Sequence, residues 1–475
     1  MNVEGRKKMS ITMAKKWDVV VAGGGPAGIP AALGAARAGA RTLLVERHGC
    51  VGGNATMGFP LHGFFNNREE RIVGGIPWEM MERLFKLDAA ADLRLLEEGG
   101  QIGRGTPEYC ARQIGVYPEA FKAVALEMLC EAGVEIMLHT WVADVLLENR
   151  RVAGLVVENK SGRAVIPAGA VVDCTGDGDV AARAGAPFER GRPGDQVTQP
   201  LTMLFALSQV DLDRAEQAGA ANRRKQEVLG SERWRKHYHC SHILLKQWQA
   251  ELDREFPELA GTMIRFNIRD WGEGVCWAGN MLHIPRLDAS DADQLTRAEI
   301  MGRDFVWRLT AFLRGHVPGF ERCHLVGTFH QIGVRETRRI LGEYYLTYED
   351  VLEARRFEDG IALCGYWVDI HDHKGVWLHI PGQGTQVKAG GAYAIPYRCL
   401  VPKAVDGVLV AGRCLSASHE AQASARVMAQ CMAMGEAAGT AAALAVRTGA
   451  SLRALDSGLL RRTLLERGAF VGDLP

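Results

Sequence analysis

Three features that are common in other classes of protein are missing from this sequence. It contains no uninterrupted run of about 18 apolar residues that could span a membrane as a helix. No long basic run breaks the balance of 56 Lys and Arg against 56 Asp and Glu, which argues against nucleic acid or an anionic membrane as a partner. The 11 cysteines include no C-x-x-C or C-x4-C pair. We therefore expect the protein to be located in a reducing cytoplasm. We also expect that it has no pair of cysteines that passes electrons on.

Residues 17–58 follow the order of elements that a dinucleotide pocket requires. An apolar run at residues 19–22 predicts a buried strand, which breaks at three consecutive glycines. Small residues at 26–38 predict a helix, and a second apolar run at 41–45 ends on Glu46. A strand, a glycine turn, a helix and a second strand with an acid at its tip form a nucleotide-binding unit.

Each glycine of this G-x-G-x-x-G turn has a physical reason. Gly23 permits the tight turn, Gly25 lets the backbone approach a pyrophosphate, and Gly28 lets the helix pack close to the sheet. The N-terminus of the helix attracts phosphates through its unpaired N–H groups and its dipole. Glu46 can accept hydrogen bonds from a ribose diol. The spacing predicts a bound nucleotide, and the alternative is a glycine-rich turn without a ligand.

Longer stretches resemble a known family. GGGPAG at residues 23–28 and GGNAT at residues 52–56 resemble the FAD-dependent oxidoreductases of the glutathione-reductase-like class. VVDCTGDGDVAARAG at 171–185, IGVRETRRILGEYYL at 332–346 and IPYRCLVPKAVDGVLVAGRCLSASHEAQASARVM at 395–428 resemble one branch of that class, the FAD-dependent oxidoreductase family. The resemblance implies FAD as the cofactor. It says little about the substrate, because the family is broad.

The resemblance also implies an α/β fold with a Rossmann-like FAD-binding domain, a β-meander and an inserted α+β substrate domain. A chain of 475 residues with 47% hydrophobic content can form two such domains. We place the FAD-binding domain at residues 14–186 and 395–475, and the inserted domain at 187–394. Alternating short strands at 142–176 predict the meander.

The hydrophobic patterns also predict individual elements. Residues 118–133, with Pro at the start and Gly at the end, predict a helix. We expect residues 211–258 to be mainly helical, and further helices at 291–315 and 421–447. The stretch from 57 to 112 contains one amphipathic helix and is otherwise irregular, so we expect it to fold over the nucleotide.

Two further turns are predicted to contact the cofactor. The glycines of residues 52–56 let backbone lie against a pyrophosphate or a ring, although the stretch could be an ordinary turn. The turn at 175–179 fits a second nucleotide site, but Asp177 and Asp179 would repel a pyrophosphate, and the resemblance explains it as a second FAD contact. The predicted cofactor-binding residues are Gly23, Gly25, Pro26, Ala27, Gly28, Glu46, Arg47, Gly52, Gly53, Asn54, Thr56, Val142, Thr175, Gly176, Asp177, Gly412, Arg413 and Ala423.

An arginine-rich run, Arg335-Glu336-Thr337-Arg338-Arg339, is the first candidate for substrate binding. Arginine is always charged and forks toward carboxylates, which suits an anionic substrate. The alternative is a salt-bridged element that Glu336 neutralises in place. Because the run matches the family pattern, we predict a role in the site for Arg335 and Arg338.

A second candidate run is Asp369-Ile370-His371-Asp372-His373. On an extended segment Asp369, His371 and His373 point to one side. We predict His371 as an acid or base near the flavin, because imidazole titrates near neutral pH. The alternative is a buried histidine with satisfied hydrogen bonds.

The remaining candidates are weaker. Tyr397 and His419 flank the return of the chain into the FAD-binding domain and could face the flavin from a domain interface. The run His237 to His242 contains three histidines and Cys240, but at helical spacing they do not form a tetrahedral set, so we predict no metal site.

These features predict an FAD-dependent oxidoreductase that passes a hydride from a small polar or anionic substrate to flavin N5. His371 or Tyr397 would take the proton, and Arg335 and Arg338 would orient the anionic part. Two alternatives stay open: a flavin-dependent isomerase or elimination enzyme without net redox change, and an electron-transfer subunit of a larger complex. The final electron acceptor is unknown, and a homodimer is the default assembly.

Overall fold

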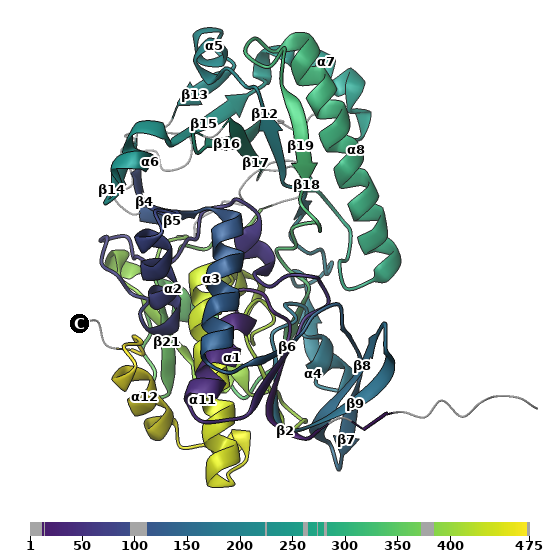
Figure 1. Ribbon diagram of the computed structural model, residues 1–475, viewed down its shortest axis with the longest axis vertical. Helices are drawn as coiled ribbons and strands as arrows, with labels where there is room; N and C mark the ends of the chain where they lie inside the picture. The colour runs from purple at the N-terminus through teal and green to yellow at the C-terminus, as the bar shows by residue number, and fades with distance from the viewer. Residues whose placement is uncertain are drawn as a thin grey trace, which may run out of the picture.

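Two β-sheets dominate the structure (Figure 1). The computed structural model describes residues 12–13, 15–95, 112–223, 226–259, 265–272, 274–279, 283–371 and 384–472. We call the part around the eight-stranded sheet the first lobe. We call residues 201–332, which surround a six-stranded sheet, the second lobe. The predicted α/β class with a Rossmann-like sheet is confirmed.

The sheet of the first lobe combines a parallel part and an antiparallel meander through one long strand. Its strands are β1 (Thr12–Met13), β2 (Trp17–Ala22), β3 (Thr42–Val45), β6 (Glu135–Met137), β7 (Trp141–Glu148), β8 (Arg151–Asn159), β9 (Gly162–Asp173) and β23 (Val408–Val410). The second half of β9 runs parallel to β2 and β23, whereas its first half pairs antiparallel with β8. The predicted meander is therefore formed by β7, β8 and β9.

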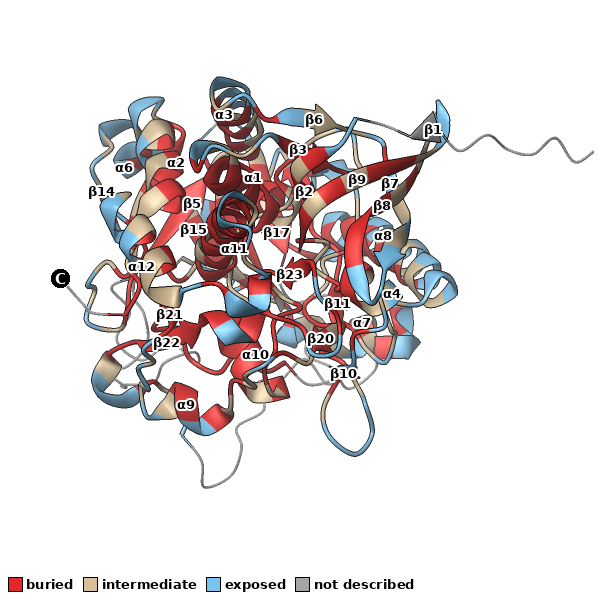
Figure 2. Ribbon diagram, turned by 90° about the horizontal axis from the view of Figure 1, so that it is seen from below, coloured by how far each residue is buried: buried red, intermediate tan, exposed pale blue. Residues whose placement is uncertain are grey.

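Two helices of small residues pack tightly over this sheet. Helix α1 (Gly28–Arg37) contacts α11 (Met428–Thr448), and both are almost completely buried (Figure 2). A side chain at Gly435 or Gly439 would overlap the backbone carbonyl of Ala27 or Ala31. Glycine at these two places lets the helix backbones touch, which holds the first glycine turn firmly against the C-terminal part of the chain.

The second lobe contains more strand than the sequence pattern predicts. Its sheet has the order β13 (Ala221–Arg223), β15 (His239–Leu244), β16 (Arg265–Asp270), β17 (Val275–Gly279), β12 (Phe205–Ser208) and β19 (His324–Thr328). The prediction that residues 211–258 are mainly helical is wrong. Three short helices there, α5 (Leu212–Gln217), α6 (Glu232–His237) and α7 (Gln249–Glu255), alternate with strands, because the pairing of β15 with β16 overrides the local pattern.

The expectation that residues 57–112 are irregular apart from one helix is also wrong. Helix α2 (Gly75–Lys86) is followed by β4 (Ala90–Leu95), which pairs with β5 (Arg112–Val116) and with β14 (Gln226–Leu229). This small sheet connects the two lobes. The buried side chains between Leu346 and Val401 pack in the core of the first lobe.

The other helix predictions agree with the structure. Residues 118–133 form α3 (Pro118–Glu131), and residues 291–315 form α8 (Ala292–His316), which lies along the second lobe (Figure 1). The helix expected at 421–447 is interrupted at residues 426–427, which separate α10 (His419–Ala425) from α11. Shorter elements are α4 (Asp179–Arg183), β10 (Phe188–Arg190), β11 (Leu201–Thr202), β18 (His283–Ile284), β20 (Arg338–Ile340), α9 (Tyr348–Leu352), β21 (Gly360–Cys364), β22 (Tyr393–Pro396) and α12 (Ser457–Glu466).

Among the helices that the structure describes, none combines the length and the apolar character needed to cross a membrane.

Candidate functional site: two adjoining cavities

The first cavity opens beyond the carboxyl ends of the parallel strands β2, β3, β9 and β23, and its volume is about 1240 Å³. Ligands of open α/β sheets bind at this edge. Most of the predicted cofactor-binding residues line this cavity, namely Gly23, Gly25, Pro26, Ala27, Glu46, Arg47, Gly53, Asn54, Val142, Thr175, Gly176, Asp177, Gly412 and Arg413. The structure thus brings four separate parts of the chain to one cavity.

The glycines of the first turn differ in their surroundings. Gly23 has a φ of +98°, and a side chain there would overlap the carbonyl group of Cys174 on β9. A side chain at Gly28 would overlap the carbonyl oxygen of Gly23, so α1 begins in contact with the turn. At Gly25, by contrast, an added Cβ would meet nothing within 4 Å. The chain itself does not require glycine at residue 25, and the open space before it belongs to the cavity.

Glu46 at the end of β3 clamps the turn from the side. One carboxylate oxygen, Oε2, accepts a hydrogen bond from the N–H of Gly24 at 2.6 Å, and the other accepts from the N–H of His48 at 2.8 Å. The carboxylate is buried and lines the cavity. In the next turn, the N–H of Gly52 donates to the carbonyl of Gly24 at 2.8 Å. Both turns therefore form one wall.

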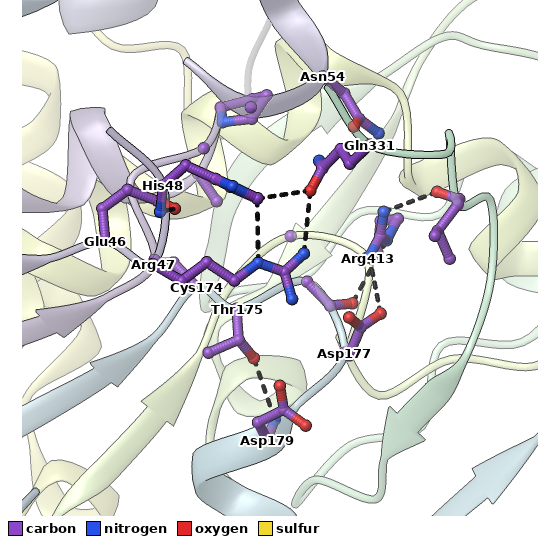
Figure 3. A pocket seen from close by; sticks show the side chains of 18 of the residues that line it. Glu46, Arg47, His48, Asn54, Cys174, Thr175, Asp177, Asp179, Gln331 and Arg413 are labelled. Atoms are coloured by element: carbon purple, nitrogen blue, oxygen red, sulfur yellow. Dashed lines mark hydrogen bonds and ion pairs between the residues drawn. The ribbon is translucent and has the colours of Figure 1, made fainter. Parts of the chain in front are cut away.

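The turn after β9 is held by a buried carboxylate. Asp173 accepts hydrogen bonds from the Thr175 hydroxyl at 2.6 Å and from the backbone N–H of Ala181 at 2.9 Å. Burial raises the pKa of Asp173 to about 6, although these hydrogen bonds oppose the shift. Asp177, farther along the turn, accepts from the guanidinium of Arg413 at 2.8 Å. Arg413 therefore neutralises the carboxylate that we expected to repel a phosphate (Figure 3).

Residues from both lobes meet across the first cavity (Figure 3). The side-chain oxygen of Gln331 accepts from Arg47 at 3.0 Å and lies 2.8 Å from Nε2 of His48. The Arg47 guanidinium also lies over the Trp141 ring at 5.3 Å. These contacts connect the end of β3 and the start of β7 with the C-terminal end of the second lobe.

The second cavity adjoins the first and has a volume of about 1150 Å³. The two cavities share Asn54, Val334, Arg413, Arg426 and Met428 in their walls. The other residues that line the second cavity are Met57, Phe59, His62, Gln113, Thr202, Leu204, Asn267, Arg269, Gly333, Arg335, Tyr366, Trp367, Asp369, His371 and Val427. Side chains of both lobes thus surround a chamber that shares part of its wall with the first cavity.

A buried histidine–carboxylate pair lies in the second cavity. Nε2 of His371 is 3.2 Å from Oδ1 of Asp369, and both side chains are largely buried. Burial lowers the pKa of His371 below its usual value, with Asp369 opposing the shift. Burial opposes ionisation of Asp369, but His371, Arg426 and Arg335 together lower the pKa of this carboxyl. At neutral pH the pair therefore consists of a neutral imidazole and a carboxylate. Arg426 donates to the Asp369 carbonyl at 2.9 Å.

The arginine-rich run separates into three environments. Arg335 lines the second cavity, where it donates to the carbonyl of Pro200 at 2.7 Å and to the hydroxyl of Thr202 at 2.5 Å. Burial lowers the pKa of Arg335 to about 9, and repulsion from Arg426 adds to the shift, so it stays charged at neutral pH. Arg338 donates to Asp179 at 2.9 Å and to the Asp177 carbonyl at 3.1 Å.

The rest of the run is a buried ion cluster. Glu336 has no exposed surface, and it accepts hydrogen bonds from Arg339 and from Nδ1 of His419. The alternative interpretation, in which Glu336 neutralises the charge of the neighbouring arginines, is therefore correct for Arg339. It does not hold for Arg335, whose side chain forms no ion pair with Glu336 in the described structure.

Comparison with known proteins identifies the family. The family model described as "FAD dependent oxidoreductase" matches residues 18–464. The chain belongs to this family. Its cofactor is FAD.

Individual relatives are more distant. A thiamine thiazole synthase of Aeropyrum pernix is 35% identical over 143 residues, which are 30% of this chain and 43% of that protein. A thiamine thiazole synthase of Methanococcus vannielii is 30% identical over 170 residues, which are 34% of this chain and 56% of that protein. The chain thus spans about half the length of these relatives. Of the solved structures, p-nitrophenol 4-monooxygenase PnpA of Pseudomonas putida has a TM-score of 0.46 at 12% identity, over 96% of this chain and 85% of that chain.

The first cavity of this FAD-dependent oxidoreductase fits FAD. A nucleotide needs a stretch of backbone that it can approach closely, and Gly25 provides one. Apart from the two chain neighbours, no atom of the described residues lies within 4 Å of the place where a side chain at residue 25 would begin, so the packing of the protein does not explain the glycine. An anionic phosphate also needs a nearby cation, and Arg47, which contacts Gln331 and the Trp141 ring, lines the same cavity. The adjoining second cavity gives room for the reacting end of a long cofactor and for a substrate.

Seven of the predicted site residues lie outside both cavity walls: Gly28, Gly52, Thr56, Arg338, Tyr397, His419 and Ala423. The Tyr397 hydroxyl donates to the carbonyl of Leu452 at 2.8 Å, inside the core of the first lobe. Thr56 donates to the carbonyl of Gly53 at 2.8 Å, and Ala423 is buried in α10. His373 lies outside the described residues.

Several residues that line the two cavities were not predicted from the sequence. Arg426 lies within the stretch that resembles the family, but nothing in its local pattern distinguishes it from a helix residue. Gln331 precedes the arginine-rich run by only a few residues, and Arg269 lies in a strand of the second lobe. His239 and His242, part of the histidine-rich run for which no metal site is predicted, belong to strand β15.

Proposed function

We propose that this FAD-dependent oxidoreductase dehydrogenates a small polar or anionic substrate that binds in the second cavity. The observation that carries the proposal is the buried pair of Asp369 and His371 in a chamber that adjoins the cavity fitting FAD. A base with a lowered pKa next to a cofactor cavity is typical of a catalytic group. FAD, when bound, supplies the acceptor of two electrons.

The roles that we propose for the protein follow from its contacts. The Asp369 carboxylate holds Nε2 of the His371 ring, so that Nδ1 takes the proton from the substrate. Arg426 fixes Asp369 from the other side and keeps it ionised. Arg335, charged and held by neutral groups, attracts the negative part of the substrate. Arg338 lies outside the cavity, and we propose that it positions the turn of Asp177.

Residues of the first cavity are proposed to hold FAD in the order that the motif predicts. Gly23, Gly25 and Gly53 would face the pyrophosphate, Glu46 the ribose, and the backbone near Val142 the adenine. The ten described cysteines are all free thiols, which supports the proposed location in a reducing cytoplasm.

Anaerobic mixing of the holoprotein with candidate metabolites tests the proposal. A substrate of a dehydrogenase bleaches the flavin absorbance, and the bleaching persists until an acceptor is added. Turnover without bleaching would instead indicate an isomerase or elimination enzyme. Holoprotein that converts no metabolite, is reduced by none, and gives no activity with an artificial acceptor would leave only the electron-transfer alternative.

The variant His371→Asn tests the role of the proposed base. We expect flavin reduction to slow by about 100-fold or more, because general-base catalysis contributes about 10²–10⁴-fold. Because burial lowers the pKa of His371, the wild-type rate should rise with pH and level off at a lower pH than a histidine of ordinary pKa would give. The variant should lose this pH dependence while its FAD content stays unchanged. A variant with the wild-type rate and pH profile would remove His371 from the mechanism.

A further inference from the structure

One guanidinium of the second cavity forms no hydrogen bond or ion pair with the residues that the structure describes. Strand β16 alternates its side chains: Phe266 and Ile268 pack in the core of the second lobe, whereas Asn267 and Arg269 lie on the opposite face and line the cavity. Arg269 is only 3% exposed. Its guanidinium lies over the ring of Phe59 at 4.7 Å. A buried arginine in such a position needs a negative partner.

The other three arginines of the cavity wall are engaged by the protein. Arg413 pairs with Asp177 at 2.8 Å, Arg426 contacts Asp369, and Arg335 donates to Pro200 and Thr202. Within the described ranges the guanidinium of Arg269 makes no hydrogen bond or ion pair, and its buried Nε has no acceptor. In the described part of the wall, Arg269 is therefore the arginine whose guanidinium no protein group holds by a hydrogen bond or an ion pair.

The charge balance of the cavity leads to the same conclusion. Among its described lining residues Asp369 is the one carboxylate, and it is already paired with His371 and Arg426. The described cavity wall thus carries an excess of positive charge, and Arg269 within it is largely buried. A buried, uncompensated arginine is costly, and an anionic ligand removes that cost.

We propose that Arg269 binds the carboxylate of the substrate and so selects carboxylic acids for this enzyme, an inference that rests on the proposed dehydrogenase function. The planar fork of arginine matches a carboxylate through two parallel hydrogen bonds. Gln113 and Asn267 lie in the same wall and can add amide hydrogen bonds to the bound group.

The rest of the wall indicates the shape of the acid. The rings of Phe59, His62 and Tyr366 follow one another with centroid separations of 5.4 Å and 5.6 Å. The guanidinium of Arg269 lies over the face of the Phe59 ring, in a cation–π contact. A carboxylate held by Arg269 therefore places its attached carbon skeleton beside aromatic side chains. A planar, apolar body, such as an aromatic or unsaturated acid, suits this wall.

Benzoate and its neutral analogue benzamide are the probes for this site. Each is titrated into purified holoprotein, and binding is followed by the absorbance of the bound flavin and by calorimetry. We expect wild type to bind benzoate about 10-fold or more tightly than benzamide, since a hydrogen-bonded charge pair is worth at least one decade in affinity. Arg269→Met should abolish this preference, and Arg269→Lys should restore part of it.

Arg214→Met is the matched control, because Arg214 belongs to the same lobe but is exposed and pairs with Glu321 at the surface. It should bind both probes as wild type does. An Arg269→Met holoprotein that has full flavin content and still prefers benzoate would overturn the proposal, as would a wild-type protein with no preference. Should benzoate bind through Arg269 while no carboxylic acid reduces the flavin, the carboxylate site stands and the dehydrogenase function fails.

Discussion

At the scale of single residues, the glycines of the first turn have different reasons: the packing of the fold requires one of them, and the cofactor explains another. A side chain at Gly28 would overlap the carbonyl oxygen of Gly23, whereas a side chain at Gly25 would meet no protein atom within 4 Å. We expect Gly28→Ala to lower the free energy of unfolding by about 2 kcal/mol or more, because the contact of α1 with the turn must open. Thermal unfolding of the FAD-free protein measures this loss.

Gly25→Ala is the matched substitution, and it should leave the FAD-free protein about as stable as wild type. Its added methyl group faces the cavity, so we expect FAD affinity to fall by about 10-fold or more. Fluorescence titration of the FAD-free protein with FAD measures the change. Unchanged affinity in Gly25→Ala would mean that the pyrophosphate does not approach residue 25.

Residues whose role depends on local spacing could be predicted from the sequence, but residues that meet only in three dimensions could not. The glycines and Glu46 share one short unit, and its order alone places them at the end of β2 and β3. Arg335 and Arg339 are four residues apart, yet one lines a cavity and the other is enclosed with Glu336. Only the fold decides which arginine keeps its charge available for a ligand.

At the scale of elements, a carboxylate on one helix caps another helix. Glu436 of α11 accepts a hydrogen bond at 3.0 Å from the N–H of Ile76, in the first turn of α2, whose own N-cap residue is a glycine. Burial raises the pKa of Glu436 to about 8, although this hydrogen bond and nearby arginines oppose the shift. The contact between α11 and α2 therefore encloses a carboxyl group that stays protonated at neutral pH.

This raised pKa makes stability depend on pH. The folded protein keeps the proton up to about pH 8, but an unfolded chain releases it above its ordinary pKa of about 4.5. The contribution of Glu436 to stability therefore falls as the pH rises from 4.5 to 8. Glu436→Gln should remove this fall and be more stable than wild type at pH 8.5 by on the order of 2 kcal/mol.

Denaturant unfolding at pH 5 and at pH 8.5 measures the difference. Glu466→Gln, an exposed substitution on α12, is the control and should follow wild type at both values. Equal pH dependence in Glu436→Gln and wild type would show that Glu436 is ionised in the folded protein.

Helices and strands were predicted correctly where the local pattern of apolar residues determines the structure. They were predicted wrongly where pairing with a strand distant in the sequence determines it. Helices α3 and α8 carry a regular apolar face, and both lie within about two residues of the predicted bounds. Strand β15 was missed because its polar residues include His239 and His242, which the partner strand β16 holds in the sheet. Pairing of this kind has no local signature in the sequence.

At the scale of the whole molecule, the first cavity connects the two lobes. Its wall contains the glycine turns of the first lobe together with Ala289, Leu295 and Glu299, which belong to the second lobe. Gln331 adds hydrogen-bond contacts with Arg47 and His48 across the cavity. A ligand that fills this space touches both lobes, so its binding should stabilise both.

Removal of FAD should therefore lower the stability of the whole protein rather than of one lobe. A ligand at 100 times its dissociation constant adds about 2.7 kcal/mol to the folded state. We expect holoprotein to unfold in one calorimetric transition, and FAD-free protein to unfold at a lower temperature, with the second lobe first. Gln331→Ala should widen the separation between the two transitions, because it removes contacts that join the lobes without FAD. If FAD-free protein unfolds in one transition at the holoprotein temperature, the cofactor does not link the lobes, and the cavity between them is not its site.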